Sequence, residues 1–149
     1  MKRLNPEPVA AGEDTIILGL DPGTGKCGLA VLSRCQGVLH QEIASVQQLA
    51  QIVPQLVTQY SIEEIGVGNR TGSPAIQDTL KRSVPNTPVA VVSEEMTSML
   101  ARRRYWEANP PRGLARLIPQ GLRVAPRPLD DYAALIIAER LLAAKATQQ

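Results

Sequence analysis

The chain has 149 residues, of which 44% are hydrophobic and 20% are charged, and its formal net charge at pH 7 is +2. The length fits one ordinary domain and excludes a second, and no apolar run is long enough to span a bilayer. Cys27 and Cys35 lack the C-x-x-C spacing of zinc and redox sites, and a single pair excludes a disulfide framework. We therefore expect a soluble protein with reduced thiols and no membrane partner.

Residues 1–14 contain Pro6, Pro8 and alternating charges, but not the apolar core of a secretory signal. We expect this segment to be a flexible tail and the protein to be cytoplasmic. The folded domain is expected at 15–146, followed by a short tail at 147–149.

The first half of the domain opens with three apolar runs that predict consecutive strands. Turn residues separate the runs, and the strands are expected at 16–20, 27–32 and 38–43. Ser45 and Gln48 then form a capping box before apolar residues that recur at helical period as far as Tyr60. Pro54 is expected to kink or shorten this helix, because proline lacks the backbone donor that a helix interior needs.

The second half alternates strands with helices. Ser73 and Pro74 make a cap and first-turn pair for one of these helices. Strands are expected at 65–68 and 88–92, and helices at 73–83, 97–107 and 129–146. Three antiparallel strands followed by β-α units predict an α/β fold, with a mixed sheet and helices on its faces.

Residues 108–128 are expected to form an irregular arm. They contain five of the 12 prolines, and loops of this length in compact domains are usually functional or disordered. Residues 101–128 also carry seven arginines, against Glu107 as the single acid. Because arginine binds phosphate bidentately, this cluster favours contact with a nucleic-acid backbone over a merely solvated loop.

The stretch from Gly23 to Gly28 matches the G-x-G-x-x-G pattern, with Glu42 at roughly the distance of a ribose-binding acid. That fingerprint works where its last glycine opens a helix, whereas a strand-like apolar run follows here. The stretch also fails as a phosphate loop. Leu20 stands where its first glycine should be, and Cys27 replaces the magnesium-binding Ser or Thr. We interpret Gly23 and Gly28 as structural turn glycines.

Carboxylates stand at two expected strand ends and at one expected helix start. They are Asp21, then Glu94 or Glu95, then Asp130 or Asp131. Like charges ~4 Å apart repel by about 4 kcal/mol at an effective dielectric near 20, so converging carboxylates need a cation. Mg²⁺ prefers such oxygen ligands, and two such ions can serve both the attacking water and the leaving oxygen of a phosphodiester. The alternative for the helix pair is structural, since acids stabilise a helix start.

Three stretches carry a family resemblance: LGLDPGTGKCGLAV, VAVVSEEMTS and LDDYAALIIAERLL. In this order they resemble the motifs of the YqgF-type Holliday-junction-resolvase-like nucleases of the RNase H-like superfamily, and the opening D-P-G also looks like the RuvC resolvases. The resemblance covers residues 15–142. It implies an RNase H-like fold with a five-stranded sheet and cleavage of structured nucleic acid with Mg²⁺ or Mn²⁺. It also implies a role in maturing the small-subunit ribosomal RNA precursor.

Residue by residue, the resemblance assigns catalysis and metal binding to Asp21, Glu94 and Asp130, with Asp131 and Glu95 as second choices. The basic residues expected to bind nucleic acid are Lys26, Arg102, Arg103, Arg104, Arg112 and Arg116.

The chain departs from the family pattern at four positions. Lys26 replaces a usual arginine, which keeps the charge but loses the planar fork. Ser93 and Glu95 replace the acid and the arginine that flank the glutamate, and Asn69 stands where a proline usually follows glycine. These departures leave the three acids in place and bear on the choice of substrate.

The leading hypothesis is a two-metal phosphodiesterase that processes the ribosomal RNA precursor. A Holliday-junction resolvase acting on branched DNA and a non-catalytic RNA-binding module are the alternatives. A small nucleotide-binding protein is a further one, although related kinases need a second domain to close over the nucleotide. We expect a monomer or a homodimer, and a junction resolvase would act as a symmetric dimer.

Overall fold

The computed structural model describes residues 14–70 and 72–148, and its centre is a five-stranded mixed sheet. The strands are β1 (Ile16–Pro22), β2 (Lys26–Ser33), β3 (Gly37–Ser45), β4 (Glu64–Gly68) and β5 (Val89–Val92). Their order across the sheet is β3-β2-β1-β4-β5. The first three strands are antiparallel, and β4 and β5 run parallel to β1. The predicted mixed sheet of three antiparallel strands followed by β-α units is confirmed.

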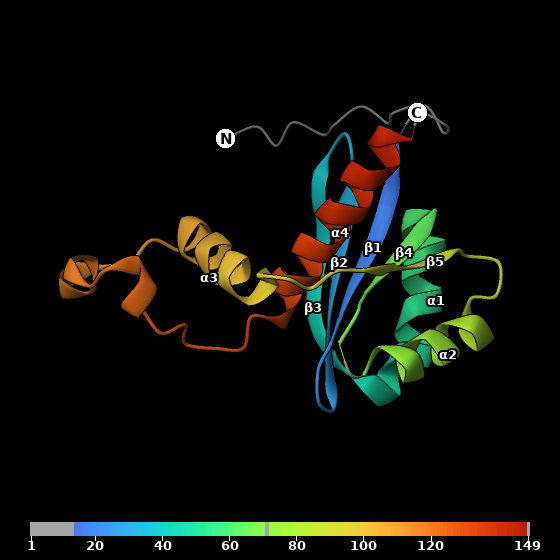
Figure 1. Cartoon of the computed structure of the whole chain (residues 1–149), viewed down its shortest axis with the longest axis horizontal. Coiled ribbons are helices and arrows are strands. Elements are labelled where there is room, and N and C mark those ends of the chain that lie inside the picture. The colour runs from blue at the N-terminus through green and yellow to red at the C-terminus, as the bar shows by residue number, and fades with distance from the viewer. Residues whose placement is uncertain (1–13, 71, 149) are drawn as a thin grey trace.

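Helices cover both faces of the sheet (Figure 1). The helices are α1 (Leu49–Tyr60), α2 (Ser73–Ser83), α3 (Thr97–Ala108) and α4 (Asp130–Thr147). Helix α4 crosses one face of the sheet, and α1 and α2 lie on the other. Helix α3 packs against α4 and leads away from the sheet into the arm, which contains two short 3-10 helices at Gly113–Leu117 and Gln120–Leu122.

Alternation along the strands gives each face its own apolar core. Leu18 and Leu20 of β1 belong to the core under α1 and α2, whereas Ile17 packs with Ala134 and Ala138 of α4. Side chains two residues apart in a strand share a face. The odd-numbered positions of β1 therefore face α4, and Asp21 is one of them.

The start of α1 follows the sequence closely. The Ser45 amide donates to Gln48 Oε1 at 3.1 Å, so the predicted capping box is present and precedes the short 3-10 turn Val46–Gln48. Pro54 does not shorten the helix, which continues to Tyr60. The expected serine cap of α2 is wrong by one position. Gly72 is the cap, because Ser73 is already helical and its hydroxyl accepts a hydrogen bond from Gln77 at 3.0 Å.

The expected N-terminal tail at 1–14 lies outside the described residues except for Asp14, as does Gln149 of the expected tail at 147–149. In the two described stretches, 14–70 and 72–148, no helix is both long and apolar enough to cross a membrane.

Candidate active site

Asp21 lies near the end of β1 on the face that α4 covers, and its exposed fraction is 5%. It is paired across the sheet with Gly28 of β2. The prediction that Gly28 is a turn glycine is wrong, because this residue lies inside the strand. A Cβ at Gly28 would overlap the backbone carbonyl of Asp130. Its lack of a side chain therefore lets the start of α4 lie directly against β2, beside Asp21.

Glu94 follows β5 and is 4% exposed. The loop after β4 surrounds it. The Arg70 amide donates to Glu94 Oε2 at 2.6 Å, and the Glu94 amide donates to Asn69 Oδ1 at 3.2 Å. A Cβ at Gly68 would overlap the Glu94 side chain. The ends of β4 and β5 thus place a second buried carboxylate at the same edge of the sheet as Asp21.

The two aspartates at the start of α4 point to different surroundings. Asp130 lines a pocket together with Asp21. Asp131 is buried and accepts two hydrogen bonds from the Arg127 guanidinium, at 3.0 and 3.2 Å. Successive helical residues project about 100° apart, so only one of the pair can face the pocket. Glu95, the other second choice, is exposed and does not line this pocket.

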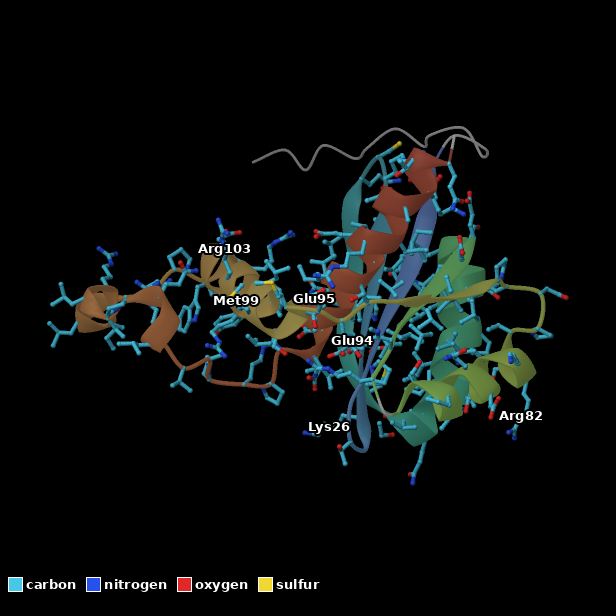
Figure 2. The ribbon with its side chains drawn as sticks, viewed as in Figure 1. Lys26, Arg82, Glu94, Glu95, Met99 and Arg103 are labelled. Carbon is cyan, nitrogen blue, oxygen red and sulfur yellow. The ribbon has the colours of Figure 1, made fainter. Side chains whose placement is uncertain are left out.

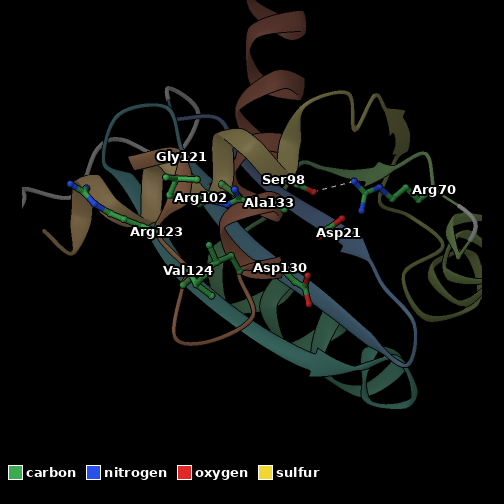
Figure 3. A pocket seen from close by; sticks show the side chains of 13 residues that line it. Asp21, Arg70, Ser98, Arg102, Gly121, Arg123, Val124, Asp130 and Ala133 are labelled. Atoms are coloured by element: carbon green, nitrogen blue, oxygen red, sulfur yellow. Dashed lines mark hydrogen bonds between the residues drawn. The ribbon is translucent and has the colours of Figure 1, made fainter. Parts of the chain in front are cut away.

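The pocket has a volume of about 520 Å³ and lies between the end of β1, helix α3, the start of α4 and the returning part of the arm. Figure 3 shows Asp21 and Asp130 in its lining, together with the basic side chains of Arg70, Arg102 and Arg123. Acidic groups at the floor and arginines at the wall make this a site with both signs of charge. Such a site suits an anionic ligand that contacts the arginines directly and the acids through bound cations.

Electrostatics set Asp21 apart from an ordinary surface carboxyl. Burial raises its pKa from 3.8 to about 8, and a hydrogen bond with Glu94 and the negative charges of Glu94 and Asp130 act in the same direction. The positive charge of Arg70 acts against them. Burial also raises the pKa of the neighbouring Cys27 thiol to about 12, so this thiol is protonated at neutral pH and is a poor nucleophile.

Within residues 14–70 and 72–148, two buried carboxylate oxygens lack hydrogen-bond partners, Asp21 Oδ1 and Glu94 Oε1. A buried oxygen of this kind costs free energy unless a proton or a cation satisfies it. Hard divalent cations such as Mg²⁺ and Mn²⁺ prefer carboxylate oxygens, so this pair fits one. Among the described residues, however, no three His, Cys, Asp or Glu side chains lie close enough together to form a metal-binding group. The pair would therefore be the core of such a site, with Asp130 beside it.

The predicted nucleic-acid-binding arginines of α3 differ in their surroundings. Arg102 lines the pocket. Arg103 is exposed and forms an ion pair with Glu107 at 3.3 Å. Arg104 instead donates to both oxygens of Glu139 of α4, at 2.7 and 2.9 Å. Because this bidentate pair occupies its guanidinium, Arg104 fastens α3 to α4 and does not present a free fork to a ligand.

The other predicted basic residues lie further from the acids. Lys26 is exposed at the start of β2, and Figure 2 shows it at the tip of the hairpin between β1 and β2. Arg112 and Arg116 are exposed on the arm, where Arg116 donates to the Pro111 carbonyl at 3.2 Å.

Sequence reasoning missed Arg70 as a member of the site and did not single out Arg123. Arg70 follows β4 directly, and ends of neighbouring parallel strands meet at one edge of a sheet. That rule alone would have predicted that residue 70 lies near Asp21. For Arg123 the sequence carries no such signal, because this residue lies in the irregular arm. Its guanidinium lies over the Trp106 ring, 5.8 Å from the centroid, and its Nε donates to the Ile118 carbonyl at 2.9 Å.

Comparison with known proteins adds information about the fold. No protein-family model and no curated protein sequence matches the chain. The solved structure of Thermus thermophilus RuvC matches with a TM-score of 0.50 and 18% sequence identity, over 83% of this chain and 90% of that chain. The fold is RNase H-like. The predicted fold class is thereby confirmed, and the resemblance to RuvC extends to the fold, whereas the narrower YqgF-type resemblance stays a prediction.

Two other solved structures match over part of their length. The PPX-GPPA enzyme of Aquifex aeolicus has a TM-score of 0.41 and 12% identity, over 67% of this chain and 43% of that chain. A ROK family glucokinase from Streptomyces griseus has a TM-score of 0.39 and 16% identity, over 60% of this chain and 36% of that chain.

Proposed function

We propose that this protein is a divalent-metal-dependent nuclease that acts on structured nucleic acid. The observation that carries the proposal is the buried pair Asp21 and Glu94, whose unpartnered oxygens lie at the edge of an RNase H-like sheet beside an arginine-lined pocket. Two buried carboxylates side by side need a compensating proton or cation. A proton on Asp21 serves in the cation-free protein, and a divalent cation bound to both carboxylates would support metal-assisted chemistry.

In this proposal Asp21 and Glu94 bind the cation, and Asp130 contributes from the start of α4. The bound cations would supply the Lewis acidity that activates water and stabilises negative charge on a phosphodiester. Asp21 has to be ionised to bind, so cation binding and proton release are coupled at this residue.

The arginines of the pocket wall would bind the phosphates of the substrate. Arg70 and Arg102 line the same pocket as Asp21 and Asp130, and a guanidinium offers a planar fork to phosphate oxygens. Arg123 also lines the pocket, but its Nε donates to the Ile118 carbonyl and its guanidinium lies over the Trp106 ring. Further out, exposed basic side chains lie at the hairpin (Lys26), on α3 (Arg103) and on the arm (Arg112 and Arg116). Because each phosphate contact releases counterions, binding should weaken steeply with salt.

Two substrates follow from different observations. The motif resemblance to YqgF-type nucleases favours the precursor of small-subunit ribosomal RNA. The similarity of fold to RuvC, a Holliday-junction resolvase, favours branched DNA and a symmetric dimer. Both substrates are bent or branched polyanions, and both would lie along the arm and the pocket.

The decisive experiment is a cleavage assay that offers a labelled ribosomal RNA precursor and a four-way DNA junction side by side, with Mg²⁺, with Mn²⁺ and with EDTA. We expect metal-dependent cleavage of one substrate by the wild type and at least 10²-fold slower cleavage by Asp21→Asn. Asp78→Asn is the matched control, because Asp78 is exposed on α2 and lies outside the pocket. Binding without cleavage under every metal would instead support the non-catalytic alternative.

A further inference from the structure

The segment Gly68-Asn69-Arg70 contacts Glu94 through three different groups. Gly68 leaves the space that the Glu94 side chain occupies. Asn69 accepts a hydrogen bond from the Glu94 amide at 3.2 Å, and the Arg70 amide donates to the Glu94 carboxylate at 2.6 Å. Asn69 is also the position at which the chain departs from the proline of the family pattern. These contacts determine both the place and the orientation of Glu94.

The two carboxylate oxygens of Glu94 make different contacts with this segment. Oε2 accepts from the Arg70 amide and lies 3.7 Å from Arg70 Nε, whereas Oε1 is buried without a partner. The backbone amide cannot leave Oε2 without moving the loop. Among the described residues Oε1 has no hydrogen-bond partner, so it is the oxygen of Glu94 that is more available to a cation.

The Arg70 guanidinium itself is less firmly bound. Its side chain is 54% exposed, and its second contact is a hydrogen bond from Nη2 to Ser98 Oγ at 3.2 Å. Figure 3 shows this side chain reaching across the pocket above Asp21 toward Ser98 at the start of α3. The guanidinium thus pairs with Glu94 and also lines the pocket.

We propose that the Arg70 guanidinium changes partner: it neutralises Glu94 in the cation-free site and binds the substrate phosphate once a cation has neutralised Glu94. This inference rests on the proposed function and deepens it by making the phosphate contact of Arg70 depend on the bound cation. The Arg70 amide and Asn69 maintain the position of Glu94 throughout.

The exchange follows from charge. A cation on Asp21 and Glu94 removes most of the attraction between Glu94 and the guanidinium and repels the latter, because both are positive. A phosphodiester placed on the same cation offers the guanidinium two acceptor oxygens in the geometry that its planar fork matches. Lysine at this position would keep the charge but not the fork.

Two measurements test the exchange, with Arg70→Gln, Arg70→Lys and the remote control Arg82→Gln. Figure 2 shows Arg82 at the far end of α2, so it has the same charge change away from the pocket. The first measurement is the Mn²⁺ affinity of the free protein by calorimetry. The second is the affinity for a fluorescein-labelled four-way DNA junction and for a labelled RNA hairpin, each in EDTA and in Ca²⁺.

We expect Arg70→Gln to bind Mn²⁺ about fivefold more tightly than wild type, because a competing positive charge is removed. We expect its nucleic-acid affinity to fall about tenfold in Ca²⁺ and less than twofold in EDTA, with Arg70→Lys in between and Arg82→Gln close to wild type. A purely structural role for Arg70 predicts weaker Mn²⁺ binding and an equal loss of nucleic-acid affinity in both conditions, and that result would overturn the proposal.

Failure of this inference is distinguishable from failure of the proposed function. If Asp21→Asn abolishes Mn²⁺ binding while Arg70→Gln behaves like Arg82→Gln, the metal site stands and the partner exchange is refuted. If wild type and Asp21→Asn bind Mn²⁺ equally weakly, both proposals are refuted. Asn69→Ala adds a separate check, because loosening the Glu94 backbone should lower Mn²⁺ affinity, opposite in sign to Arg70→Gln.

Discussion

Replacing Asp21 by asparagine is expected to stabilise the cation-free protein at neutral pH. The folded-state pKa of Asp21 is about 8, whereas an unfolded aspartate titrates near 3.8. Between these values the folded protein binds a proton that the unfolded chain releases. The stability contributed by this proton is therefore complete below pH ~3.8 and is lost as the pH rises toward ~8.

The size of the effect follows from the difference between the two pKa values. At pH 7 ionisation of Asp21 in the unfolded chain lowers the free energy of unfolding by about 4 kcal/mol relative to a residue that does not titrate. Asparagine removes this cost but buries an amide, whose unmet hydrogen bonds cost about 1–3 kcal/mol. A net gain of about 1–3 kcal/mol is left, which corresponds to an increase in Tm of roughly 3–10 °C for a chain of this length.

The assay is urea and thermal denaturation of wild type and Asp21→Asn in EDTA, followed by circular dichroism from pH 4.5 to pH 8.5. From pH 4.5 to pH 7 the free energy of unfolding of the variant should rise relative to that of wild type by about 3 kcal/mol, and Asp78→Asn should show no such trend. A difference between Asp21→Asn and wild type that stays constant over this range would refute the assigned environment of Asp21.

Three further predictions concern the same edge of the sheet. Mn²⁺ at ten times its dissociation constant should stabilise wild type by about 1.4 kcal/mol, a rise in Tm of roughly 3–5 °C, and scanning fluorimetry should show no such rise for Asp21→Asn. Asp130→Asn should lose cleavage and keep its stability. Asp131→Asn should lose about 1–3 kcal/mol in free energy of unfolding and open the arm to limited proteolysis, because Arg127 loses its partner. The reverse pattern would exchange the roles of the two aspartates. Gly28→Ala should cost about 3 kcal/mol or more in urea denaturation, since its methyl group overlaps the start of α4, and a stability equal to wild type would contradict that close approach.

The order of strands and helices was predictable because local sequence patterns determine it. Apolar runs bounded by turn residues predicted the five strands, and the Ser45 capping box, the Ser73-Pro74 pair and helical periodicity predicted the helices. The exceptions are small. Gly72 caps α2 in place of Ser73, and α1 passes through Pro54. Ser73 is buried and its hydroxyl accepts a hydrogen bond from Gln77, which leaves the cap to Gly72.

The sequence by itself determined where the acids of the site lie along the chain. Asp21 and Glu94 follow apolar strands, and the strand-end rule alone places such residues at one edge of a sheet. The tertiary structure decided between Asp130 and Asp131, since both flank the apolar seam of α4 and only packing shows that Arg127 takes one of them.

The tertiary structure also decided which basic residues belong to the site. Arg104 is bound to Glu139, 35 residues away along the chain, whereas Arg70 reaches Glu94 across 24 residues. Such pairs depend on distances in space that no local period encodes. The sequence thus contains the chemical groups in the right order, and the close packing of α4 and the β4 loop against the sheet selects which of them meet.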